Sequence, residues 1–365
     1  MPNARCFLSH RERSLEALEE LSEELHSTPL EPNGVGLLLA SEHHRPQAER
    51  LRSTLAVNAS ISTLMGTITS AGVINERGYF DEPFLALLRW EPGGRYIPRA
   101  LQVSRLGDNN FDDSVNAALM LSSTSTARAV LESAALHDIF TMGAVTFASE
   151  PTLQFHGDGS IIAGATGLGW LDVDAIATVL IPSAEELGPS LEVTAAHQDI
   201  VIELDGRPAV DVLCEIAKIS DEDEAFHSLG TEYLIGVEHD AHDYTQRIYR
   251  HIRALDPQRR MFSIDHDVQS GDRLIVGHRN ATSAARLIDE YCGKLKARLS
   301  GRRIEALVFQ GCIARGPALF DSVDDEAERI RHHFPDIPLI GTYGNGEFFG
   351  QELQSYAAVL TAILG

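Results

Sequence analysis

Apolar residues recur along the chain in two patterns, and each pattern predicts a different element. Near the N-terminus, leucines between Leu15 and Leu25 have helical spacing, and Ser9 with Glu12 matches a capping box that would begin a helix. Pro29 would end it. We therefore expect an N-terminal helical segment within residues 1–27.

Short apolar runs bounded by turn residues form the second pattern and predict buried strands. Residues 34–40 and 61–65 are two such runs, with an amphipathic helical pattern over residues 47–55 between them. The second run continues into residues 66–72, where glycine, threonine and serine predominate. We expect this segment to be a loop at the end of the strand.

The C-terminal third repeats this order of elements. It contains, in sequence, a helix over 284–299, a strand over 305–309, a loop over 310–316, a helix capped by Ser322–Asp325, a strand over 338–340 and a loop over 341–347. The similar segments Leu64-Met-Gly-Thr67 and Leu339-Ile-Gly-Thr342 end the last strand of each copy. We infer two related units, one in each half. The alternative is coincidence between two ordinary α/β units.

The middle of the chain is rich in predicted strands. We expect strands at 178–182, 191–193, 200–204 and 233–237, a strand pair formed by 261–264 and 273–277, and helices at 208–217 and 244–255. This mixture predicts an α/β (mixed α+β) fold, in which two related halves each carry a strand–loop–helix–strand–glycine-rich-loop unit. No Pro- or Ser-rich linker interrupts the chain, so we expect the halves to pack as one body with a boundary between residues 207 and 208.

Charge and cysteine usage narrow the class of protein. Of 365 residues, 53 are acidic and 30 basic, which gives a formal net charge of −23. Binding of nucleic acid or of an anionic membrane needs a concentrated basic surface, so we expect neither partner. The four cysteines show no metal or redox spacing, and the N-terminus lacks the apolar core of a signal peptide. These features predict a protein of the reducing cytoplasm.

The strongest candidate chemistry lies in the C-terminal glycine-rich segments. Cys312 and Arg315 follow a buried strand, and Gly341, Gly344 and Glu347 follow the next one. Ligands of open α/β sheets bind beside such strand ends, where glycines allow a close approach of the backbone. Arg315 could bind a carboxylate or phosphate, and Glu347 could accept from an amine. The alternative is an Arg315–Glu347 ion pair that holds two loops together.

The matching segment of the first unit offers hydroxyl groups and backbone amides. Thr67, Thr69 and Gly72 would line the same ligand pocket if the two units face each other. The alternative is ordinary turn chemistry without a ligand.

Cys312 also raises the question of catalysis. A nucleophilic thiol needs a depressed pKa and a nearby base, for which His278, His332 and His333 are the candidates. The chain has no nucleophile elbow, no P-loop and no dinucleotide-binding glycine motif. We therefore assign no catalytic residue and expect a binding protein, with a cysteine-dependent hydrolase or transferase as an alternative.

Fifteen histidines leave a metal or haem site open. His239 and His242 could share a metal ion, although their acidic surroundings favour a solvated loop. The adjacent pairs at 43–44 and 332–333 are expected on the surface. A single axial ligand could come from any of four residues, and the sequence does not choose among them. These residues are His197, His239, His242 and His266.

The order of several motifs resembles the FIST proteins. The motifs are Gly66–Val73, Ile202–Ala209, Tyr233–Gly236, Arg247 followed by Asp256-Pro257, Gly311–Gly316 and Gly341–Glu347. The resemblance covers about residues 34–350 and implies an N-terminal FIST-like domain over 28–207 and a C-terminal one over 208–365. It also implies a sensory module of bacterial signal transduction that binds a small ligand, such as an amino acid.

The resemblance leaves a second ligand class open. Some family members, which this chain resembles in length, are haem-binding nitric oxide sensors that control a partner histidine kinase. Residues 354–361 lack the histidine that some members carry there, so no cofactor is assigned and haem stays an alternative. We expect an amino-acid-like metabolite to bind between the halves and to regulate a separate partner, such as a histidine kinase or a cyclase.

Overall fold

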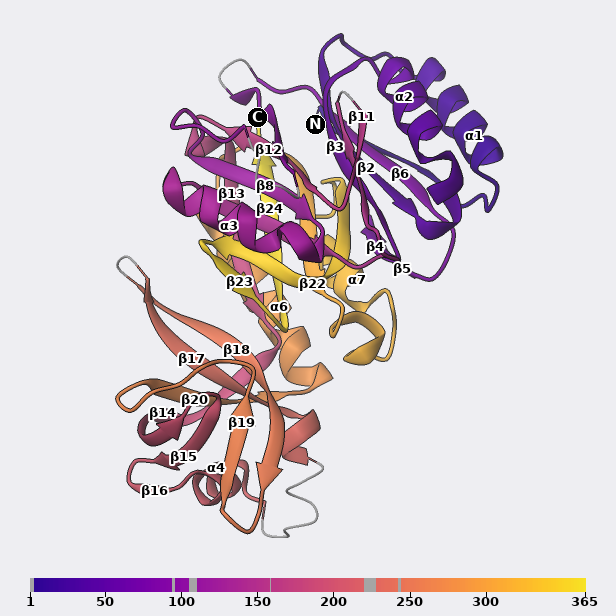
Figure 1. The fold of residues 1–365 in the computed structure, drawn as a ribbon. Coiled ribbons are helices and arrows are strands. Elements are labelled where there is room, and N and C mark those ends of the chain that lie inside the picture. Colours follow the sequence, from indigo (N-terminus) through magenta and orange to yellow (C-terminus); the bar gives the residue numbers. More distant parts are fainter. Residues whose placement is uncertain (1–2, 94–95, 105–109, 158, 220–227, 242–243) are drawn as a thin grey trace. The chain divides into compact units, whose positions relative to one another are not determined.

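A computed structural model describes residues 3–93, 96–104, 110–157, 159–219, 228–241 and 244–365 (Figure 1). The chain divides into two compact units. Unit 1 contains Met1–Ile181, Ile288–Leu353 and Ala357–Gly365, and unit 2 contains Pro182–Leu287 and Gln354–Tyr356. The boundary expected between residues 207 and 208 lies within unit 2. It stays a prediction about sequence domains, because compactness and sequence similarity are different criteria.

Two sheets form the centre of unit 1. Among the described residues, the first sheet has the strand order β1 (Arg5–Ser9), β6 (Leu85–Trp90), β2 (Gly34–Ser41), β3 (Ile61–Thr69), β10 (Leu153–His156) and β11 (Gly159–Ile162). The second has the order β13 (Ile176–Pro182), β24 (Ala357–Leu364), β21 (Ile304–Cys312), β22 (Leu339–Gly350), β9 (Phe140–Thr146), β8 (Ala117–Ser122), β12 (Ala165–Trp170) and β7 (Arg99–Val103). Three short strands join it beside β22, namely β4 (Ala71–Ile74), β5 (Arg77–Phe80) and β23 (Glu352–Gln354).

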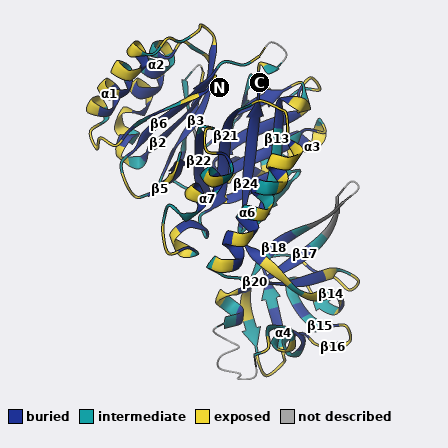
Figure 2. Cartoon of the chain, turned by 180° about the vertical axis from the view of Figure 1, so that it is seen from behind, coloured by how far each residue is buried: buried dark blue, intermediate teal, exposed yellow. Residues whose placement is uncertain are grey.

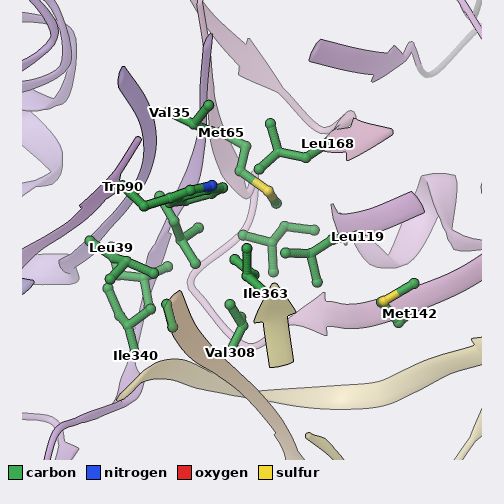
Figure 3. Close-up of a cluster of buried hydrophobic side chains, with 14 of the residues drawn as sticks. Val35, Leu39, Met65, Trp90, Leu119, Met142, Leu168, Val308, Ile340 and Ile363 are labelled. Atoms are coloured by element: carbon green, nitrogen blue, oxygen red, sulfur yellow. The ribbon is translucent and has the colours of Figure 1, made fainter. Parts of the chain in front are cut away.

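The main core of unit 1 lies between these two sheets. Met65 and Trp90 come from the first sheet, and Leu119, Val308 and Ile340 come from the second (Figure 3). All five are at most 1 % exposed, and the dark interior of Figure 2 follows both sheets. Both predicted repeat units contribute to this core, so the two repeat units pack together within unit 1.

Helices cover the outer faces of the two sheets. The helices of the whole described chain are α1 (Ser14–Ser27), α2 (Ala48–Asn58), α3 (Ala127–Leu136), α4 (Ala209–Ala217), which belongs to unit 2, α6 (Ala281–Arg298) and α7 (Asp325–His333). The short 3-10 turns are η1 (Glu42–Gln47), η3 (Thr124–Thr126), η4 (Val173–Ala175) and η5 (Gly316–Ala318). Leu21 of α1 and Leu51 of α2 pack against Leu38 of β2, and Val130 of α3 packs against Met120 of β8. No helix in the described part is long and apolar enough to cross a membrane.

Three segments of unit 1 share one design, in which a strand, a 3-10 turn and a helix lead to a parallel neighbouring strand. The pairs are β2 with β3, β8 with β9, and β21 with β22. In each pair a glycine of the second strand, Gly66, Gly143 or Gly341, faces the first strand so closely that a β-carbon would overlap a carbonyl oxygen of that strand. The sequence predicted the first and third copies but missed the second, although its first strand, β8, is an equally continuous apolar run.

Unit 2 contains one antiparallel sheet with α4 packed against it. In the described residues its order is β14 (Ala184–His197), β20 (Arg273–Arg279), β17 (Tyr233–Ala241), β18 (Tyr244–Asp256), β19 (Met261–Ile264), β15 (Ile200–Leu204) and β16 (Arg207–Pro208). An additional pairing of β14 with β15 closes the sheet on itself. Its apolar core includes Ile235, Phe262 and Leu213.

The mixed α/β class is confirmed, but several local predictions are wrong, three of them away from the candidate site. Ser9 ends strand β1 and does not cap a helix, because its hydroxyl group donates to Glu20 and α1 begins at Ser14. Residues 244–255 are strand β18, where a bulge between Ile252 and Ala254 breaks the two-residue alternation and imitates helical spacing. Strands β19 and β20 pair with other neighbours and not with each other.

Candidate functional site

The two glycine- and threonine-rich segments meet inside unit 1. Gly72 of β4 pairs with Thr342 of β22, and the hydroxyl oxygens of Thr69 and Thr342 are 2.8 Å apart. The prediction that these segments are loops is wrong. They extend β3 and β22 as buried strands, because hydrogen bonding to neighbouring strands satisfies their backbone groups.

The hydroxyl groups of the first segment are already used within the protein. Thr67 Oγ1 donates to the carbonyl of Ile68 at 2.9 Å, and Thr69 Oγ1 donates to the carbonyl of Ala71 at 3.0 Å. Both threonines are 0 % exposed. The packing explains these residues without a ligand, so a role of Thr67, Thr69 and Gly72 in binding stays a prediction.

Close packing also explains the two glycines of β22. Gly341 faces Phe309 in the parallel strand, and Gly344 lies opposite Cys312, where a β-carbon would overlap the carbonyl oxygen of Val145. Each position therefore requires glycine for strand packing alone. Their proximity to the carboxyl end of β21 is the feature that still connects them with a ligand.

Arg315 turns back over the end of β21 and forms a buried ion pair. Its backbone amide donates to the carbonyl of Cys312 at 2.8 Å, and its Nε donates to Glu326 Oε1 at 2.7 Å. Arg315 and Glu326 are 0 % and 1 % exposed. The sequence missed Glu326, because an acidic residue in the first turn of a helix usually lies on the surface.

Glu326 is fully satisfied by three donors. Besides the guanidinium of Arg315, it accepts from the backbone amide of Gly316 at 3.2 Å and from the hydroxyl of Tyr343 at 3.0 Å. Burial, followed by the Glu326 carboxylate, raises the pKa of Tyr343 well above its ordinary value, so Tyr343 stays a proton donor. Arg315, Glu326 and Tyr343 thus form a rigid ionic cluster at the ends of β21 and β22.

Glu347 differs from Glu326 because neighbouring donors do not satisfy its carboxyl group. It is 0 % exposed, and neither of its carboxyl oxygens has a hydrogen-bond partner with normal geometry in the described structure. Burial raises the pKa of Glu347 well above its ordinary value, although Arg315 and the backbone amide of Ala357 oppose the shift. Glu347 therefore holds a proton beyond the pH at which an exposed glutamate ionises.

A donor group of Arg315 matches this unpaired acid. Arg315 Nη2 is also buried without a hydrogen-bond partner, while Nη1 reaches the carbonyl of Ile181 at 3.4 Å. Leaving one buried polar group unsatisfied costs about 1–3 kcal/mol. Arg315 and Glu347 interact electrostatically, but the ion pair of Arg315 is with Glu326 and not with Glu347. The pair offers one donor and one acidic group to a third partner.

The histidines do not favour catalysis by Cys312. His278 lies 3.7 Å from Glu232, and His333 lies 3.2 Å from Asp289, so both candidate bases have acidic partners of their own. The third candidate, His332, is exposed. Since a thiolate mechanism needs a base directed at the sulfur, none of these three side chains supports the hydrolase or transferase alternative.

His44 corrects one prediction about the histidine pairs. It is buried and not on the surface, because η1 turns it inward, where Nδ1 lies 3.1 Å from the hydroxyl of Ser14. Burial lowers its pKa to about 4. No cluster of three or more metal-ligating side chains occurs among the residues that the structure describes.

The candidate haem ligands are scattered over unit 2. His197 ends β14 and is exposed, and His266 follows β19. His242 and the side chain of His239 lie outside the described residues. The haem alternative therefore gains no support from the described histidines.

Comparisons with known proteins agree with the order of motifs. The model of the FIST N domain matches residues 34–207, and that of the FIST C domain matches residues 209–350. Uncharacterized proteins of Mycobacterium bovis and Mycobacterium tuberculosis are each 25 % identical to this chain in alignments of 363 positions, which cover 92 % of this chain and 90 % of the relative. With both domain models matched over most of its length, the chain belongs to the FIST family of small-ligand sensory proteins.

Proposed function

We propose that this protein senses a small zwitterion with the features of an amino acid, bound between Arg315 and Glu347. The observation that carries the proposal is the buried carboxyl group of Glu347, whose two oxygens have no hydrogen-bond partner with normal geometry, together with the unused Nη2 of Arg315. A ligand ammonium would pair with Glu347, and a ligand carboxylate would accept from Arg315. Binding would thereby satisfy polar groups that are unsatisfied without it.

The overall charge supports a zwitterion over an anion. At a net charge of −23, the field of the chain slows the approach of anions, and the charge of Arg315 is already balanced by Glu326. A polyanion such as a nucleotide would face Glu326 and Glu347 together. A ligand that carries its own ammonium group brings the positive charge that Glu347 needs in order to ionise.

The enclosed site supports a sensory role. Because Arg315 and Glu347 are both 0 % exposed, a ligand can enter only when the segments around them move apart. A ligand that stabilises a rearranged state shifts the population toward that state, which a second protein can detect. We propose that the protein acts in the cytoplasm on a separate partner, a histidine kinase or a cyclase, as the family resemblance implies.

Thermal-shift measurements with a panel of free amino acids test the proposal. A ligand present at about a hundred times its dissociation constant should stabilise the protein by about 2.7 kcal/mol. Arg315→Lys and Glu347→Gln keep the size of each side chain and should abolish the shift, whereas Glu132→Gln, an exposed change on α3, should leave it intact. Unchanged binding by both site variants would refute the site. A Soret band after expression with haem would instead support the haem alternative.

A further inference from the structure

A separate cavity of unit 1 follows strand β1. Its volume is about 990 Å³, and it is lined by the four consecutive residues Ala4–Phe7, by Glu24 near the end of α1, by Glu76 after β4, and by Arg331 and Asp336 on and after α7. None of these residues belongs to the cluster around Arg315 and Glu347. The cavity is therefore separate from the proposed ligand site.

The cavity lies along an open sheet edge. Side chains of successive strand residues point to opposite faces, so a space that touches four consecutive residues must run along the backbone edge of the strand. Within the described residues, β1 is the terminal strand of its sheet and pairs with β6 alone. Such an edge exposes backbone donors and acceptors that can pair with another extended chain.

The walls of this groove are acidic. Glu24, Glu76 and Asp336 are all exposed. Two cationic side chains also line the groove, but Arg331 already donates to the carbonyl of Ile337 at 2.6 Å, and Arg5 interacts electrostatically with Glu91, which does not line the cavity. The groove thus favours a positively charged occupant, and the net charge of −23 adds to this preference.

We propose that an extended, basic segment of a partner protein adds to β1 as a further strand. Its backbone would hydrogen-bond to residues 4–7, and lysine or arginine side chains at alternate positions would reach Glu24, Glu76 and Asp336. A second copy of this chain is a poor occupant, because two chains of the same large negative charge repel each other.

Fluorescence anisotropy with defined peptides tests this interaction. The probes are labelled peptides of about eight residues in which valine alternates with lysine or with glutamate, and a Val–Lys peptide with methylated backbone nitrogens. The Val–Lys probe should bind, and more weakly at high salt, because exposed charges are screened. The Val–Glu probe and the methylated probe should fail, because the first lacks the charge and the second cannot pair with β1.

Charge reversal supplies the matched variants. Glu76→Lys combined with Asp336→Lys should weaken binding of the Val–Lys probe by about tenfold or more, whereas Glu132→Lys on α3 should have little effect. Glu347→Gln should not change peptide binding, which separates this proposal from the ligand site. Equal binding of the methylated probe, or no effect of the double reversal, would overturn it. Self-association abolished by the same double reversal would identify a second copy as the occupant and would also overturn it.

Discussion

Replacing Glu347 with glutamine tests the protonation state on which the proposed site depends. Glutamine has nearly the same shape as a protonated glutamate but cannot ionise. Glu347 is fully buried, and burial raises its pKa well above the ordinary 4.5. Glu347→Gln should therefore fold normally and should mimic the wild-type protein at acidic pH.

The pH dependence gives the magnitude. Above pH 4.5 the unfolded chain loses the Glu347 proton, whereas the folded chain retains it until its raised pKa is passed. The folded state then binds more protons, so the contribution of Glu347 to the free energy of unfolding falls by about 1.4 kcal/mol per pH unit within that window. The contribution is fully present below pH 4.5 and is lost as the pH rises through the folded pKa. Glu347→Gln cannot ionise, so its free energy of unfolding does not undergo this decrease.

Urea unfolding from pH 4.5 to pH 8 measures the difference directly. The free energy of unfolding of Glu347→Gln, relative to the wild type, should increase steadily with pH. Glu132→Gln, whose side chain is 63 % exposed, is the matched control and should follow the wild-type curve. Parallel curves for the wild type and Glu347→Gln would mean that Glu347 is ionised in the folded protein, and the reasoning about the site would fail.

Three further changes test the surrounding structure. Gly341→Ala should destabilise the protein by about 1–3 kcal/mol or more, because its β-carbon would overlap the backbone of β21. Gly157→Ala is the control, since its β-carbon would meet no atom within 4 Å, and thermal melts compare the two variants. Tyr343→Phe should lower the free energy of unfolding by about 1–3 kcal/mol, since Glu326 loses a buried donor, and an unchanged denaturation midpoint would contradict the cluster. Because burial lowers the pKa of His44 from 6.5 to about 4, stability should decrease as the pH falls from 6.5 to 4, and His44→Gln should flatten that decrease in urea titrations.

The sequence predicts those elements whose burial is local and regular. The apolar runs of β2 and β21 and the amphipathic pattern of α2 identify the repeated unit, because a strand buried on both faces is apolar throughout. The glycine-rich ends of β3 and β22 were misassigned as loops. Glycine there permits two parallel strands to approach closely, and only the tertiary structure distinguishes this role from a turn.

The candidate site is predictable in part for the same reason. Arg315 and Glu347 are polar residues beside apolar strands, which marks them in the sequence. The ion pair between Arg315 and Glu326 joins a strand end to a helix 11 positions later, and nothing in the local pattern indicates that this glutamate faces inward. Because the sequence does not reveal Glu326 as a partner, it suggests Glu347 as the partner of Arg315 in the alternative ion pair. The structure leaves Glu347 unpaired, and this difference is what makes a ligand plausible.

The threefold repeat in unit 1 explains why the proposed ligand site occurs in the third copy. The residues opposite the three packed glycines are Leu38, Met120 and Phe309. Six positions after each of them the chain carries a polar residue that is 0 % exposed, namely His44, Thr126 and Arg315. The same backbone therefore buries a polar side chain at the end of each first strand.

These three side chains differ in the charge that they introduce. His44 is neutral beside Ser14, and Thr126 shares hydrogen bonds with neighbouring serines. Arg315 is charged and needs Glu326, and six residues after Gly341 the chain adds the buried acid Glu347. The corresponding positions after Gly66 and Gly143 hold Gly72 and Ser149, which supply no acid. Ligand binding should accordingly survive His44→Gln and be lost in Glu347→Gln.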